Sequence, residues 1–199
     1  MKERKTLNTR NLVLLALLTA IVIILQVFAA FLPIFPFTLT LVLVPIVIGA
    51  ALVSPSSGGW LGLIFGAVVL LTGNANVFMA LNPAATIIIV LLKGLLAGLA
   101  AGFVYKLLAK KSRTVAVVCA AVVCPIVNTG IFIIGSYIFF LPVVMGFADF
   151  FGYDNATAII FLGLVGINFP LELAINLVLS PTIVRLIQYG QDKREVIKA

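Results

Sequence analysis

The chain has 199 residues, of which 63% are hydrophobic and only 10% are charged, and its formal net charge is +7. Soluble domains carry about 25% charged residues, so lipid must be the solvent for much of this protein. The chain has no histidine, which excludes Ser-His and Cys-His catalysis and histidine-based zinc sites. Its few acidic residues are scattered, so we expect no enzyme activity, no catalytic residue, no metal site and no cofactor.

Six apolar segments follow one another along the chain, and four of them reach the roughly 20 residues that a membrane helix needs. The second and third are shorter, and the Ser, Pro and Gly residues of 54–59 between them are typical of a turn. These two runs form either two short spans or one re-entrant hairpin. We predict an all-α integral membrane protein, one transmembrane domain over residues 1–199, folded as a six-transmembrane-helix bundle. The predicted spans are residues 12–32, 39–53, 60–72, 84–105, 114–144 and 156–184.

The start of the chain has basic residues followed by an apolar run, as a signal peptide does, but the run is longer than the usual 7–15 residues. We therefore interpret it as an uncleaved first span. All basic residues except Lys93 fall within residues 2–10, 106–113 and 185–198. Basic residues flank membrane spans on the cytoplasmic side, so both termini are predicted to be cytoplasmic. The same interpretation explains the net positive charge without nucleic-acid binding.

Lys93 and Glu172 are the two charges placed well inside the apolar segments. Each lies 13 residues before a basic residue of a cytoplasmic cluster, Lys106 and Arg185 respectively, which places both about 20 Å above that interface. Charges at such depth are costly and usually face a bundle interior or a substrate. Three interpretations stay open: an ion pair, contacts to a substrate, or an incidental neutral group.

Polar residues accompany these two charges. Asn168, Glu172 and Asn176 recur every four residues and form one stripe on the last predicted helix. Asn128 and Gln26 fall at a similar depth in other spans. Polar groups in hydrocarbon must find partners, so we expect these side chains to converge, either to contact a ligand or to hold helices together.

Segments 32–40, 73–83 and 145–155 are predicted to lie on the side of the membrane opposite the basic clusters, and we call them the outer segments. They contain no Lys or Arg, and they mix aromatic residues with asparagines. Apolar walls with a few placed polar groups are typical of a small-molecule pocket. An aromatic belt at the membrane interface would explain the rings but not the asparagines. The candidate ligand residues of these segments are Asn74, Asn76, Asn82, Phe35 and Phe78.

Small residues recur at intervals of four in three helices. Two series are glycines, Gly58, Gly62 and Gly66, then Gly94, Gly98 and Gly102, and they favour close packing of helices within the bundle. Cys119 and Cys124 lie five residues apart, on different sides of a helix, and are interpreted as small buried hydrophobic residues. The third series is Ala16 and Ala20 in the first span, for which the spacing alone indicates the same internal packing.

The segment Ala16-Leu17-Leu18-Thr19-Ala20, together with the chain length and the six apolar segments, resembles the substrate-binding (S) component of an energy-coupling factor (ECF) transporter. In that family the Ala-x-x-x-Ala motif contacts a transmembrane T component that carries two cytoplasmic ATPase subunits. The resemblance therefore implies that Ala16 and Ala20 form a partner interface. It also implies that the protein topples in the membrane to deliver its ligand.

The resemblance further implies a high-affinity binding subunit for a vitamin or related micronutrient in the plasma membrane of a prokaryote. Pantothenate ranks first as the ligand because Lys93 suits an anion, followed by riboflavin or folate. Two other functions stay open at this point: a stand-alone small-molecule carrier or channel, and a structural membrane subunit.

Overall fold

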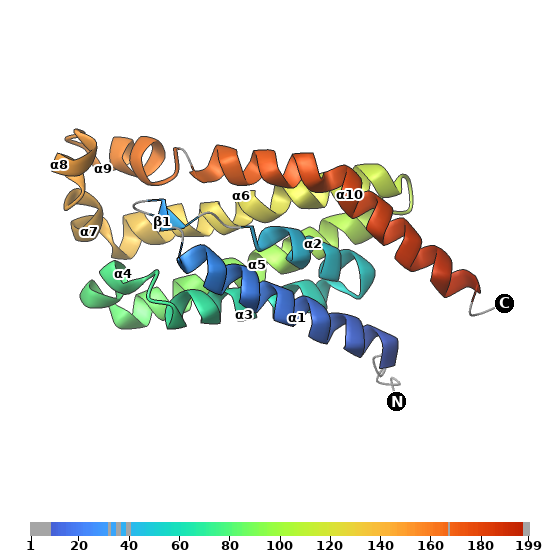
Figure 1. Cartoon of the computed structure of the whole chain (residues 1–199). Coiled ribbons are helices and arrows are strands. Elements are labelled where there is room, and N and C mark those ends of the chain that lie inside the picture. Colours follow the sequence, from blue (N-terminus) through green and yellow to red (C-terminus); the bar gives the residue numbers. More distant parts are fainter. Residues whose placement is uncertain (1–8, 32, 35–36, 39–40, 167, 197–199) are drawn as a thin grey trace, which may run out of the picture.

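A computed structural model describes residues 9–31, 33–34, 37–38, 41–166 and 168–196, and Figure 1 shows its helices packed side by side in an elongated bundle. The first helices are α1 (Thr9–Ala30), α2 (Leu43–Leu52), α3 (Pro55–Leu71), α4 (Asn76–Leu81) and α5 (Pro83–Leu108). They are followed by α6 (Arg113–Phe139), α7 (Leu141–Met145), α8 (Ala148–Phe151), α9 (Ala156–Ala158), the π-helix η1 (Ile159–Leu164) and α10 (Asn168–Val196). The helical prediction is confirmed, with one small exception: β1 (Pro33–Ile34) pairs antiparallel with β2 (Phe37–Thr38).

Among the residues that the structure describes, four stretches are long and apolar enough to cross a membrane: α1, α5, α6 and Ala156–Arg185. The helices α2 and α3 have 10 and 17 residues, which gives lengths of about 15 and 25 Å, against a hydrocarbon core about 30 Å thick. The six-span count therefore stays a prediction. The start of α1, the α5–α6 turn and the end of α10 lie at one end of the bundle, while α4, α7 and α8 lie at the other (Figure 1). This arrangement agrees with the predicted sidedness of the basic clusters, although the cytoplasmic location of the termini also stays a prediction.

Residues 54–59 were predicted as a turn, but most of them form the beginning of α3. The side chain of Ser54 accepts a hydrogen bond from the backbone N–H of Ser57 at 3.1 Å and caps the helix, and Pro55 occupies its first position. Proline is favoured there because that N–H has no partner inside the helix. Gly58 and Gly59 consequently belong to the helix rather than to a loop.

The glycine series bring α3 and α5 into backbone contact. A Cβ added at Gly58 would lie 2.5 Å from the carbonyl oxygen of Gly98, and one added at Gly66 would lie 2.7 Å from that of Val90. A Cβ at either Gly62 or Gly94 would meet the carbonyl of the other residue. The prediction of close internal packing is confirmed for these residues, and it is the absence of side chains that lets the two helices approach.

The last two predicted spans are interrupted in the structure. Segment 114–144 divides into α6 and the short helix α7 at Phe140, where Pro142 cannot donate a backbone hydrogen bond to continue α6. Segment 156–184 begins as α9 and η1 and resumes as α10 after Gly166. Pro170 has no N–H to donate to the carbonyl of Gly166, so the regular pattern of helical hydrogen bonds is interrupted at Gly166.

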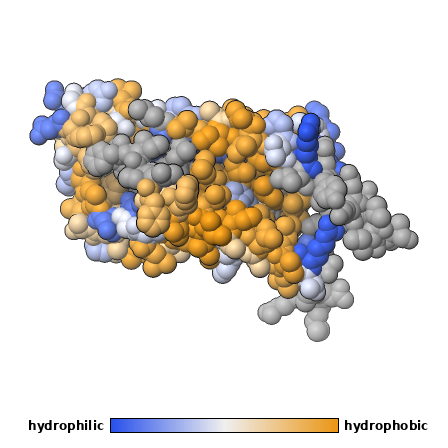
Figure 2. Space-filling view, viewed as in Figure 1, coloured by the Kyte–Doolittle hydropathy of each residue, from blue (hydrophilic) through white to orange (hydrophobic). Residues whose placement is uncertain are grey.

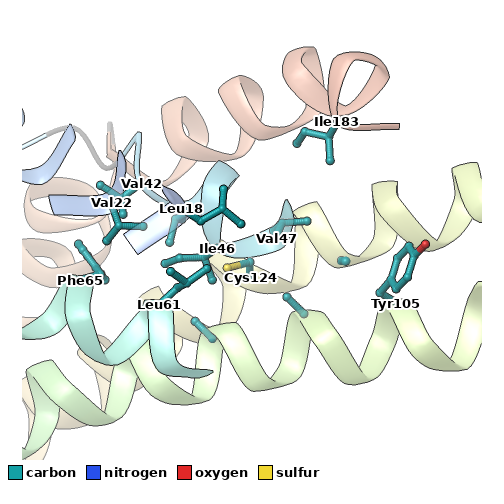
Figure 3. Close-up of a cluster of buried hydrophobic side chains, with 14 of the residues drawn as sticks. Leu18, Val22, Val42, Ile46, Val47, Leu61, Phe65, Tyr105, Cys124 and Ile183 are labelled. Carbon is teal, nitrogen blue, oxygen red and sulfur yellow. The ribbon is translucent and has the colours of Figure 1, made fainter. Parts of the chain in front are cut away.

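The main hydrophobic core lies where α1, α2, α3, α5, α6 and α10 meet. Figure 3 shows Leu18, Val22, Ile46, Leu61 and Phe65 from three of these helices grouped in it, with Ile183 of α10 above. Cys124 is also buried in this core, as predicted, and Cys119 is partly buried. Large apolar side chains also cover much of the outer surface, where Figure 2 shows hydrophobic residues across the middle of the visible face. Such a surface matches lipid as the surrounding solvent.

Candidate functional site

Lys93 lies on α5 between two aromatic rings. Its Nζ is 5.7 Å from the ring centroid of Phe65 on α3 and 5.7 Å from that of Phe132 on α6. These distances are within the range of cation–π attraction, which strengthens when water is excluded. Glu172 of α10 is only 5% exposed and lies within electrostatic range of Lys93. The two charges that the sequence placed at one depth therefore lie close enough to interact electrostatically.

The polar stripe of α10 is largely buried. Asn176 is fully buried, and its Nδ2 donates a hydrogen bond to the backbone carbonyl of Glu172 at 2.8 Å. One turn further, the Oγ of Ser180 donates to the carbonyl of Asn176 at 2.8 Å. The Oδ1 of Asn176 has no hydrogen-bond partner within the described part of the chain. Asn168, at the first position of α10, is partly buried.

A matching stripe runs along α6, where Cys124, Asn128, Phe132 and Ser136 follow one another at intervals of four. Asn128 is 5% exposed and Ser136 is fully buried, and both the Oδ1 of Asn128 and the Oγ of Ser136 lack partners among the residues that the structure describes. Glu172 lies within electrostatic range of Cys124, so the stripes of α6 and α10 are close. Phe132 and Ser136 were not predicted as members of the site, although each follows Asn128 at a multiple of four residues, a spacing that indicates the same helix face.

Gln26 of α1 is a third buried amide in the bundle interior. It is 1% exposed, and its Oε1 has no partner over the described residues. An acceptor buried without a partner costs about 1–3 kcal/mol. Three such amide oxygens therefore represent a considerable cost, which is offset if a ligand or water supplies the donors.

The predicted aromatic residue Phe78 joins this region to the end of the bundle that carries α4. Its ring contacts the ring of Phe132 edge-on, with centroids 5.8 Å apart, and that of Phe140 at 5.0 Å. Phe132 thus touches both the ammonium of Lys93 and the buried aromatic cluster beside α4. The sequence did not identify Phe65, Phe132 or Phe140 as members of the site.

The asparagines of segment 73–83 are not among the buried polar groups. Asn74 is partly buried in the turn between α3 and α4, and Asn76 is exposed at the start of α4. The side-chain oxygen of Asn82 accepts a hydrogen bond from the N–H of Ala85 at 3.1 Å and caps α5. Asn82 therefore has a structural function that the sequence analysis did not assign. Phe35 lies outside the described residues.

Ala16 and Ala20 are exposed on α1, on the side away from the buried edge of that helix. Trp60 of α3 borders this exposed face, because its Nε1 donates a hydrogen bond to the Oγ of Thr19 at 3.4 Å. The Thr19 hydroxyl in turn donates to the carbonyl of Leu15 at 2.8 Å. The two alanines are therefore free of contacts that would bury them inside the bundle, contrary to the internal packing that spacing alone indicated.

In a comparison with protein families, the model of the substrate-specific component of ECF transporters matches residues 10–184. The chain belongs to this family. The S component is a multi-pass membrane protein and a transport subunit rather than an enzyme. Membership also implies a small-molecule substrate, a T component and ATPase partners. Searches of curated proteins and of solved structures gave no match.

Proposed function

We propose that this S component binds a vitamin or related micronutrient among Lys93, Asn128, Glu172 and Asn176. ATP hydrolysis for import is supplied by two cytoplasmic ATPase subunits through the T component, in the plasma membrane of a prokaryote. The observation that carries the proposal is a lysine held by two aromatic rings beside buried amide oxygens without partners. Binding sites for small molecules combine apolar walls with a few such polar groups.

Pantothenate is the first candidate substrate, because its carboxylate suits the Lys93 ammonium. Folate also carries carboxylates, and riboflavin presents an aromatic ring system that suits Phe65, Phe78 and Phe132. Asn168, at the start of α10, is proposed as a further contact above Glu172. At the outer end of the site we retain three asparagines and one aromatic residue as proposed contacts: Asn74, Asn76, Asn82 and Phe35.

The substrate is identified by thermal unfolding of the detergent-purified S component with a panel of B vitamins and their precursors. A ligand at 100 times its Kd adds about 2.7 kcal/mol to the free energy of unfolding. We expect a clear rise of Tm with one compound, and pantothenate is the first to test. A panel without any shift would contradict the proposed binding function and favour a structural subunit. Uptake into liposomes that contain this chain alone would favour a stand-alone carrier or channel instead.

The Ala16 and Ala20 face is proposed as the contact surface for the T component. We expect the double variant Ala16→Leu, Ala20→Leu to lose copurification with coexpressed T component and ATPases, since bulky side chains prevent close helix approach. The Tm shift with the identified vitamin should remain, because neither alanine faces the bundle interior. Ala174→Leu on the exposed side of α10 is the matched control and should copurify normally. Loss of copurification in that control as well would contradict a specific interface.

A further inference from the structure

We infer that the substrate presents hydroxyl groups to the buried amides of Asn176 and Asn128, donating to the Oδ1 of Asn176, and that Asn176 discriminates between substrates with and without such a hydroxyl. The inference rests on the proposed function, and it specifies the chemistry that the same site selects. It follows from the orientation of the Asn176 amide rather than from the charge of Lys93.

The amide of Asn176 has a fixed orientation. Its Nδ2 donates to the carbonyl of Glu172 at 2.8 Å, so its Oδ1 must point in the other direction. Exchanging the two amide atoms would place an oxygen against that carbonyl oxygen, which is an acceptor facing an acceptor. Asn176 therefore presents its Oδ1 acceptor on the side away from that carbonyl, and this atom is fully buried and lacks a partner among the described residues.

Two further buried amides of the bundle also have unpartnered oxygens. The Oδ1 of Asn128 and the Oε1 of Gln26 are likewise buried acceptors with no donor in the described structure. The cation nearby, Lys93, is directed at the rings of Phe65 and Phe132. The Asn176 oxygen needs a donor, and a ligand hydroxyl, which both donates and accepts, can satisfy this oxygen and the amide of Asn128.

Helix association offers a weaker explanation of these atoms. Amides that hold membrane helices together do so by hydrogen bonding across the interface, and such a bond would satisfy the oxygens of Asn128 and Asn176. Within the described structure neither oxygen has such a bond. A donor brought by the substrate removes the cost of leaving them unpaired.

The test is a cycle of variants and ligands followed by direct measurement of Kd. The ligands are pantothenate and its two monodeoxy analogues, each with one hydroxyl replaced by hydrogen. If the vitamin panel selects riboflavin, the pair is riboflavin and lumiflavin, which lacks the ribityl hydroxyls. The proteins are the unmodified S component, Asn176→Leu, and Ser180→Ala as a control. Ser180 is buried one turn away, but its hydroxyl is bonded to the backbone.

We expect Asn176→Leu to weaken binding of the full vitamin by about 10- to 100-fold, the usual cost of one buried hydrogen bond. On the unmodified protein, one deoxy analogue should bind more weakly than the full vitamin by a similar factor. On Asn176→Leu, this analogue and the full vitamin should bind with nearly equal Kd. Ser180→Ala should keep the Kd within about twofold. The inference would be overturned if the affinity losses caused by the substitution and by removal of the hydroxyl multiplied, as they do for two independent contacts. An unchanged Kd for Asn176→Leu would also overturn it.

Asn128→Leu takes the place of Asn176→Leu in the same cycle if the latter does not fold. The outcome also separates the inference from the proposed function. An unmodified protein that binds one vitamin but discriminates against no deoxy analogue keeps the function and overturns the inference. An unmodified protein that binds no vitamin contradicts both.

Discussion

Gly62→Ala is expected to destabilise the bundle by about 3 kcal/mol or more, the upper part of the range for overpacked cores. The added Cβ would overlap the carbonyl group of Gly94, and this neighbour is backbone rather than a flexible side chain. The clash is relieved only if α3 and α5 move apart along their whole contact. Thermal unfolding in detergent should show a markedly lower Tm or a loss of folded protein.

Gly130→Ala on α6 is the matched control, because a Cβ at Gly130 meets no atom within 4 Å. Alanine favours a helix interior over glycine by about 1 kcal/mol, so this variant should be as stable as the unmodified protein or slightly more stable. Gly94→Ala should behave like Gly62→Ala, since the contact is reciprocal. Equal Tm values for Gly62→Ala and Gly130→Ala would show that the α3–α5 contact is not held by backbone proximity.

The glycine series illustrate how far the sequence predicts this fold. The spacing of Gly58, Gly62 and Gly66 predicts a helix face that approaches another backbone closely. It does not specify the partner, because several small-residue faces are available and the choice depends on the packing of the whole bundle. The structure pairs this face with α5, in an antiparallel arrangement in which Gly58 lies against Gly98 and Gly62 against Gly94.

The helix interruptions were missed for a different reason. Apolar run length detects membrane segments, but it contains no information on backbone hydrogen bonds. Pro142 and Pro170 each remove one donor in the middle of an apolar run, and the helices divide near them, whereas α6 and α10 continue through Pro125 and Pro181. Run length likewise gives no information on where a helix starts. The pairs Ser54-Pro55 and Asn82-Pro83 are typical of a helix start, a capping residue followed by proline. These signals were present in the sequence, although composition favoured a turn at residues 54–59.

The candidate site around Lys93 and Glu172 could be predicted in part because charged and amide residues are rare in apolar segments. Lys93, Glu172, Asn128 and Asn176 stood out for this reason, and the structure places them in neighbouring helices. Phe65 and Phe132 did not stand out, because phenylalanine is common on every apolar face and only the tertiary packing aligns these two rings with Lys93.

Lys93→Met is expected to weaken pantothenate binding by about 100-fold, which is in the range for a hydrogen bond to a charged group. Methionine keeps an unbranched apolar chain that can lie between Phe65 and Phe132, and its sulfur is favourable beside aromatic rings. The unmodified S component should prefer pantothenate over pantothenol, in which a hydroxymethyl group replaces the carboxylate. Lys93→Met should bind the two compounds with nearly equal Kd, measured by titration in detergent.

Two further variants separate charge recognition from a loss of structure. Lys106→Met removes a lysine from the exposed end of α5 and should leave the Kd and the preference unchanged. Lys93→Met leaves Glu172 buried without the nearby cation, which is destabilising in itself. The double variant Lys93→Met, Glu172→Gln removes both charges, so it should regain stability but not the preference for pantothenate. If Lys93→Met still prefers pantothenate, Lys93 does not bind the carboxylate of the ligand. The Lys93 ammonium then stabilises the helix bundle through Glu172 and the two rings.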